Sequence, residues 1–120
     1  MDLTTYQQTA VSTAKYPDVG ANLVYPALGL AGECGEVVEH IKKAYRVHGR
    51  VSCNTAGPGS VTTMSGIYNA PQLALELGDV LWYIAALASE IGYDLSEIAQ
   101  MNLDKLADRK ESGTLTEVSR

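Results

Sequence analysis

Two pairs of carboxylates along the chain share one spacing. Glu33 and Glu36 form the first pair, and Glu76 and Asp79 form the second, with the members of each pair three positions apart. Residues at this spacing lie on one side of a helix. A cluster of carboxylates with no partnering His or Cys favours hard cations, Mg²⁺ or Mn²⁺, over zinc. Such ions polarise phosphoryl oxygens and lower the pKa of a bound water, so the four acids predict metal-assisted chemistry on a phosphate.

Both pairs belong to predicted helices, over residues 25–46 and 71–91. On a helical wheel each pair borders an apolar face in the same way. The two faces consist of Leu30, Cys34, Val37, Val38, Ile41, Ala44 and Tyr45 in the first helix, and of Leu73, Leu77, Val80, Ile84, Leu87, Ala88 and Ile91 in the second. If the two faces pack together, the four acids converge on one volume.

Such convergence carries an electrostatic cost. Two like charges about 4 Å apart repel by about 4 kcal/mol at an effective dielectric constant near 20, so the cluster requires bound cations, raised pKa values or both. A single acid pair at this spacing is usually a solvated face, and Glu39 is expected to be solvated. The pair in residues 71–91 instead has apolar and aromatic neighbours, which favours a site over a solvated face: Leu75, Leu77, Val80, Leu81, Trp82 and Tyr83.

The remaining pattern predicts an all-α, four-helix-bundle-like fold. A first helix is expected from residue 3 to about residue 15, where Pro17 and Gly20 follow. A fourth is expected over residues 94–110, and it opens with a capping-box pattern from Asp94 to Glu97.

The chain of 120 residues is expected to form a single domain. Residues 48–69 are rich in turn formers and predict a long loop insertion, with a short strand or hairpin over 61–68 as an alternative to plain loop. Residues 112–120 are polar and predict a flexible tail.

The helix over residues 71–91 is also apolar on its far side, where Leu75, Trp82, Ala85 and Ala86 lie. A helix that is apolar all round is buried on two sides, and a small chain has few elements to cover both. A homo-oligomer is therefore expected.

The predicted fourth helix carries a second polar cluster. Asn102 lies within its apolar stripe, and Lys105 and Arg109 line the same edge. An Asn in such a stripe is more often a hydrogen-bonded structural residue, but two neighbouring cations make a role in gripping phosphates competitive. Lys43 is a further candidate for that role, whereas Lys42 is expected to interact with the negative end of its own helix.

Composition restricts the class of partner and the compartment. The net charge of −5 argues against binding to a nucleic-acid polymer. The sequence contains no apolar run long enough to cross a membrane and no signal-peptide pattern at its start. Cys34 and Cys53 form no metal-type or disulfide spacing, so both are expected to be reduced thiols in the cytoplasm.

Three stretches of the chain resemble the MazG-like all-α nucleoside triphosphate pyrophosphohydrolases. The first signature of that family resembles GLAGECGEV at residues 29–37 with IKK at 41–43, and the second resembles ELGDVLWY at 76–83. The family's C-terminal pattern resembles the set Asn102, Lys105, Leu106, Arg109 and Gly113. Apart from the loop, the resemblance covers residues 28–113.

This resemblance implies hydrolysis of a nucleoside triphosphate between its α- and β-phosphates, giving a monophosphate and pyrophosphate for housecleaning or nucleotide-pool control. It implies that Mg²⁺, or Mn²⁺ in its place, is held by Glu33, Glu36, Glu76 and Asp79, with one glutamate as a candidate general base. It implies that Asn102, Lys105 and Arg109 contact phosphates or sugar. Family members are dimers or tetramers with sites near subunit interfaces, so a homodimer or homotetramer is expected here.

Two departures from the family pattern bear on this expectation. Gly32 stands where many members carry a further glutamate, and the 39 residues between Glu36 and Glu76 exceed the usual spacing. Alternative functions are a dimeric dUTPase, a phosphoribosyl-ATP pyrophosphohydrolase and a non-catalytic helical interaction module. A di-iron carboxylate bundle is disfavoured because the chain lacks the paired Glu-x-x-His motifs of that class.

Overall fold

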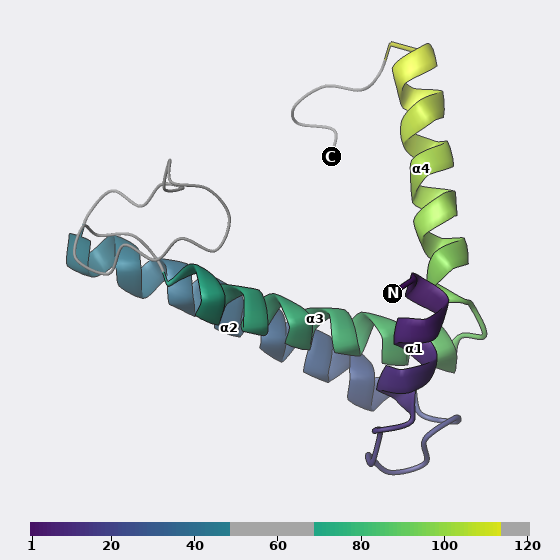
Figure 1. Ribbon diagram of the computed structural model, residues 1–120, viewed down its shortest axis with the longest axis horizontal. Coiled ribbons are helices and arrows are strands. Elements are labelled where there is room, and N and C mark those ends of the chain that lie inside the picture. Colours follow the sequence, from purple (N-terminus) through teal and green to yellow (C-terminus); the bar gives the residue numbers. More distant parts are fainter. Residues whose placement is uncertain (49–68, 114–120) are drawn as a thin grey trace.

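The computed structural model describes residues 1–48 and 69–113, and these residues form four helices (Figure 1). The helices are α1 (Leu3–Val11), α2 (Val24–His48), α3 (Ala70–Glu90) and α4 (Leu95–Glu111). The all-α class and all four predicted helices are therefore confirmed. Of the predicted loop insertion, only its two end residues are described; the hairpin alternative and the tail beyond residue 113 lie outside the described residues.

Polar side chains mark where the helices begin. Asp2 caps α1 by accepting from the Thr5 N–H at 2.7 Å, and Asn69 caps α3 by accepting from the Gln72 N–H at 3.1 Å. Asn22 accepts from the first two N–H groups of α2, at 3.1 and 3.0 Å. Each cap satisfies donors that have no partner inside the helix, which explains why these helices start where they do.

The predicted capping box of α4 is present, since Glu97 accepts from the Asp94 N–H at 3.3 Å while the Asp94 side chain accepts from the Glu97 N–H. The turn before it passes through Gly92, whose φ of 82° lies in the region that glycine adopts without a steric penalty. This glycine lets α3 turn into α4 through a short connection.

The first helix is shorter than predicted. It ends at Val11 rather than near residue 15. The hydroxyls of Ser12 and Thr13 donate to the carbonyl oxygens of Thr9 and Ala10, at 2.5 and 2.6 Å. Local bonds of this kind compete with helix propagation, and the apolar periodicity of the sequence does not contain them.

Helices α2 and α3 lie side by side and antiparallel, and α1 crosses the C-terminal half of α3 (Figure 1). The small core lies at that crossing, where Ala10, Ala85 and Leu95 are buried. The side chain of Gln7 is also buried there, and its Oε1 accepts from the Leu95 N–H at 2.7 Å while its Nε2 donates to the carbonyl oxygen of Tyr93 at 3.0 Å. A satisfied buried amide thus fixes α1 to the junction of α3 and α4.

This crossing corrects one expectation about burial. Ala85 lies on the far side of α3, which was expected to be covered by a second subunit, but the chain covers it with Ala10 of α1. Leu75, further toward the start of α3, is 67% exposed. The oligomer therefore stays a prediction, and it applies to the N-terminal half of α3.

The apolar face predicted for α2 is only partly covered. Cys34, Val38 and Tyr45 are exposed, so their assignment to the core is wrong within the described chain. The α2 helix is rotated about its own axis relative to the predicted arrangement, because α3 packs on the side of α2 that carries Gly29 and His40. Two of the exposed residues, Val38 and Tyr45, line an open apolar groove of about 390 Å³ together with Val37, Ile41 and Lys42. Leu77 of α3 is likewise 51% exposed.

The loop between α1 and α2 is held by Glu90 at the end of α3. Its carboxylate accepts from the Asn22 N–H at 3.0 Å, the Gly20 N–H at 2.8 Å and the Tyr16 hydroxyl at 2.8 Å. These bonds lower the pKa of Glu90, with the two backbone donors contributing most. Burial, followed by the bond to Glu90 and its charge, raises the pKa of Tyr16 to about 12. The Tyr16 ring also stacks on Tyr25, with centroids 5.0 Å apart.

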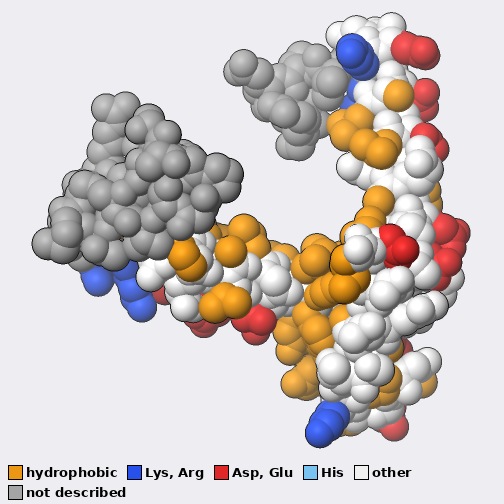
Figure 2. All heavy atoms as spheres, in the orientation of Figure 1, with side chains coloured by type: hydrophobic (Ala, Val, Ile, Leu, Met, Phe, Trp, Pro, Cys, Tyr) orange, Lys and Arg blue, Asp and Glu red, His pale blue; other side chains and the backbone are white. Residues whose placement is uncertain are grey.

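Helix α4 packs against α1 and α3, but among the described helices it has no contact with α2, and it extends away from the α2–α3 pair (Figure 1). Figure 2 shows hydrophobic side chains on the α2–α3 pair and on the side of α4 that faces it, with acidic side chains along the outer edge of α4. No described helix has both the length and the apolar character required to span a membrane.

Candidate active site between α2 and α3

Two contacts fix how α2 and α3 are aligned. Near the start of α2, Gly29 faces the ring of Tyr83, and one turn further along Glu33 lines the same pocket as Asp79. A Cβ at position 29 would fall within the van der Waals radius of the Tyr83 ring carbons. The absence of a side chain at position 29 therefore allows the two acid-bearing helices to approach closely.

The pocket has a volume of about 310 Å³ and is open to solvent. Its lining consists of Glu33 from α2 and of Asp79, Trp82 and Tyr83 from α3. The two rings meet edge to face, with centroids 4.9 Å apart and an interplanar angle of 78°. One acid from each predicted pair thus shares a pocket that has an aromatic wall.

The neighbouring tyrosines report the negative charge of this pocket. Burial first, then Tyr25, and then the charges of Glu33 and Asp79 raise the pKa of Tyr83. Burial and the charge of Asp79 also raise the pKa of Tyr6, which α1 contributes. Both phenols are therefore neutral at neutral pH, and both lie within reach of the charge of Asp79.

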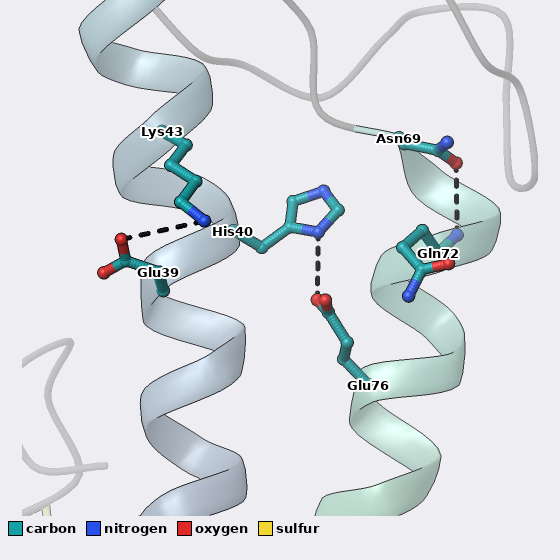
Figure 3. Close-up of polar contacts among 6 residues, drawn as sticks. All are labelled: Glu39, His40, Lys43, Asn69, Gln72 and Glu76. Atoms are coloured by element: carbon teal, nitrogen blue, oxygen red, sulfur yellow. Dashed lines mark hydrogen bonds and ion pairs between the residues drawn. The ribbon is translucent and has the colours of Figure 1, made fainter.

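The second level of acids lies further along the same helices. Glu36 follows Glu33 by three residues in α2, and Glu76 precedes Asp79 by three residues in α3. Because the helices are antiparallel, Glu36 and Glu76 lie at the same level along the pair. Glu36 is exposed, whereas the side chain of Glu76 is only 17% exposed. Glu76 extends toward His40, whose Nδ1 lies 2.9 Å from Oε2 of Glu76 (Figure 3).

The His40–Glu76 contact is close but not well aligned. The 2.9 Å separation is within hydrogen-bonding range, yet Oε2 is buried without a hydrogen bond of acceptable geometry. The contact therefore leaves the carboxylate incompletely satisfied. Buried carboxylates in this condition are costly unless a cation or a donor compensates them.

The donor set fits a divalent cation in its chemistry. Among the side chains in residues 1–48 and 69–113, no three His, Cys, Asp or Glu residues stand close enough to form a ready metal cage. Glu33 and Asp79 instead share one pocket, and the buried oxygen of Glu76 lacks an aligned partner. All-oxygen ligands and an uncompensated buried charge are the features that Mg²⁺ or Mn²⁺ would satisfy.

The predicted phosphate-binding residues lie apart from the acids. Asn102 and Lys105 are exposed on α4 and Arg109 is half-buried there, on a helix that has no contact with α2 in the described structure. Lys43 lies on α2, but its Nζ is 4.0 Å from the carboxylate of Glu39, beside the helix rather than between α2 and α3 (Figure 3). The described chain does not bring these four residues next to the acids.

Three residues near the acids were not predicted as site residues: Tyr6, His40 and Tyr83. Tyr83 directly follows the second acid pair by one turn, and that spacing was a usable signal. His40 lies one turn after Glu36 in the sequence, but no site role was predicted for it. Tyr6 carried no signal, because its approach to Asp79 depends on how α1 crosses α3.

Comparisons with known proteins bear on the same residues. The family model described as "MazG nucleotide pyrophosphohydrolase domain" matches residues 26–114, which include both acid pairs. The chain is also similar to the "Gene 37 protein" of Mycobacterium phage L5, with 37% identity over 120 residues, 96% of this chain and 94% of that protein. No solved structure matches the chain significantly. The chain therefore belongs to the family of MazG nucleotide pyrophosphohydrolase domains.

Proposed function

We propose that the protein is a Mg²⁺-dependent hydrolase that converts a ribo- or deoxyribonucleoside triphosphate to its monophosphate and pyrophosphate. The observation that carries the proposal is the shared pocket of Glu33 and Asp79, one acid from each of two helices that the family match includes. Four carboxylates on adjoining turns of two packed helices suit a metal-bound phosphate chain better than they suit a solvated surface.

Glu33, Glu36, Glu76 and Asp79 are the proposed ligands of Mg²⁺ or Mn²⁺. When bound, the metal would polarise the phosphoryl oxygens and lower the pKa of a water. One of the three glutamates is the candidate general base. Trp82 and Tyr83 form the aromatic wall of the pocket beside Glu33 and Asp79.

Asn102, Lys105, Arg109 and Lys43 remain the proposed contacts for phosphate or sugar. Since α4 has no contact with α2 in the described structure, we propose that a second subunit of a homodimer or homotetramer supplies the three residues of α4, which are Asn102, Lys105 and Arg109. The cellular role that suits this activity is removal of unwanted nucleotides or control of nucleotide pools.

The test is a product analysis of the full chain with Mg²⁺ across canonical and modified nucleoside triphosphates, dUTP and phosphoribosyl-ATP. The expected result is equimolar monophosphate and pyrophosphate, abolished by EDTA and restored by Mg²⁺. Exclusive turnover of dUTP or of phosphoribosyl-ATP would reassign the substrate within the same chemistry. Diphosphate with inorganic phosphate would contradict the proposed bond cleavage, and no product from any nucleotide would favour a non-catalytic helical module.

A further inference from the structure

Between α2 and α3, the side chain of Glu76 contacts a residue that has no role in the proposed chemistry. The Nδ1 atom of His40 lies 2.9 Å from Oε2 of Glu76, and the two side chains are 12% and 17% exposed (Figure 3). Both therefore lie largely away from solvent, where a polar contact contributes more than it does at the surface. A substitution of either residue therefore changes the surroundings of the other side chain.

The alignment of the helices makes this pairing informative. Glu36 is the residue of α2 level with Glu76, and His40 lies one turn further along. The Glu76 side chain extends toward that imidazole (Figure 3). His40 is thus the side chain of α2 that the Glu76 carboxylate contacts.

We propose that His40 is a positioning residue for Glu76, whose imidazole holds the carboxylate between α2 and α3 for a divalent cation. The inference rests on the proposed function, because it assumes that Glu76 is a metal ligand. Carboxylates that bind metal ions are commonly held by a second polar group, and loss of that group typically weakens metal binding about 10–100-fold. A direct ligand role for Nδ1 is disfavoured because that atom already faces Glu76.

Cation binding separates this role from a purely structural one. Wild-type protein and variants are titrated with Mn²⁺, and free Mn²⁺ is followed by electron paramagnetic resonance without nucleotide or turnover. His40→Phe keeps a ring but removes both nitrogens, and it is expected to weaken Mn²⁺ binding about 10–100-fold. His40→Leu serves as a second test should the larger ring disturb folding. His40→Asn should retain most of the affinity, because its amide nitrogen is bonded to Cγ as Nδ1 is.

The matched control is Glu39→Gln, one residue away on the outer side of α2, where the carboxylate pairs with Lys42 at 2.8 Å. Its Mn²⁺ affinity is expected to equal that of the wild type, and thermal unfolding in EDTA confirms that each variant is folded. Folded His40→Phe or His40→Leu protein that binds Mn²⁺ as tightly as the wild type, or more tightly, overturns the inference. Wild-type protein with no Mn²⁺ binding overturns the proposed function itself, whereas loss of binding only in Asp79→Asn overturns the His40 role alone.

Discussion

The α2–α3 pair carries the predicted metal ligands, and helix α4 carries most of the predicted phosphate-binding residues. The two regions differ in whether a single chain brings these residues together. In the first region, direct packing of antiparallel helices brings Glu33 and Asp79 to one pocket. In the second, Asn102 and Lys105 stand exposed on a helix that extends away from α2 (Figure 1). A single chain therefore aligns the acids, but it does not bring the phosphate-binding candidates to them.

Apolar side chains exposed on both regions suggest what completes the site. Leu75 and Leu77 on α3 are 67% and 51% exposed, and Met101 and Leu103 on α4 are 54% and 59% exposed. Figure 2 shows hydrophobic side chains on both arms of the angle that these helices enclose. Exposed apolar side chains in such number are typical of an interface, which agrees with the predicted homo-oligomer.

The largest expected effect comes from the acids themselves. Asp79→Asn and Glu36→Gln should each lower kcat/KM at least about a hundredfold, because a catalytic cation supplies several kcal/mol of transition-state stabilisation. Glu39→Gln removes a carboxylate from the same helix without touching the α2–α3 contact and should leave the rate unchanged. Steady-state kinetics with pyrophosphate detection measures all three, and equal losses in all three would remove the distinction between site and surface acids.

A charge reversal on α4 tests the other side of the comparison. Lys105→Glu should raise KM by roughly tenfold or more, since hydrogen bonds to charged groups contribute about 1.5–3 kcal/mol. If a second subunit supplies this lysine, co-refolding Asp79→Asn chains with Lys105→Glu chains should give more activity than either protein alone. Activity no higher than the mean of the two pure proteins would place the acids and the lysine in the same subunit's site.

The helix alignment is tested at Gly29. An Ala at this position would collide with the Tyr83 ring, so Gly29→Ala should destabilise the protein by about 1–3 kcal/mol and lower activity. Gly32→Ala, where a Cβ meets no atom within 4 Å, should be neutral or stabilising by up to about 1 kcal/mol. Urea unfolding of the two variants gives the comparison, and similar stabilities would show that Tyr83 does not pack on α2 as described.

The smallest effect concerns the loop before α2. The folded pKa of Glu90 is lowered, so its contribution to stability is present above the unfolded pKa and is lost as pH falls through the folded value. Glu90→Gln lacks this contribution, and its unfolding temperature should therefore approach that of the wild type as pH falls from about 7 to about 3. The exposed residue Glu111, changed to Gln, is the control. A gap between Glu90→Gln and wild type that stays constant over this range would contradict the assignment.

Much of the fold was predictable because helical periodicity and capping are local. The pattern from Asp94 to Glu97 predicted the start of α4, and the predicted bounds of α3 differ from the observed ones by one residue at each end. The end of α1 was missed because hydroxyl bonds from Ser12 and Thr13 outweigh a weak apolar pattern. Boundaries set by such side-chain bonds depend on a balance that periodicity does not contain.

The approach of Glu33 to Asp79 was predictable, but the neighbours of these two acids were not. Glu33 and Asp79 could be placed together from two equivalent helical wheels, whereas the rotation of α2 that exposes Cys34 and Val38 depends on Gly29 admitting the ring of a distant tyrosine. That contact is a property of the packed pair of helices. For the same reason the wheel gave no signal that His40 would face Glu76.

The most direct test of the account is a crystal of the full chain grown with Mn²⁺ and examined by anomalous scattering. The account predicts an anomalous peak between α2 and α3, within about 2.0–2.3 Å of carboxylate oxygens from both helices. The ligands that α3 contributes include Glu76 and Asp79. Carboxylates of α2 and α3 directed into separate solvent regions, with no ion between them at saturating Mn²⁺, would contradict it.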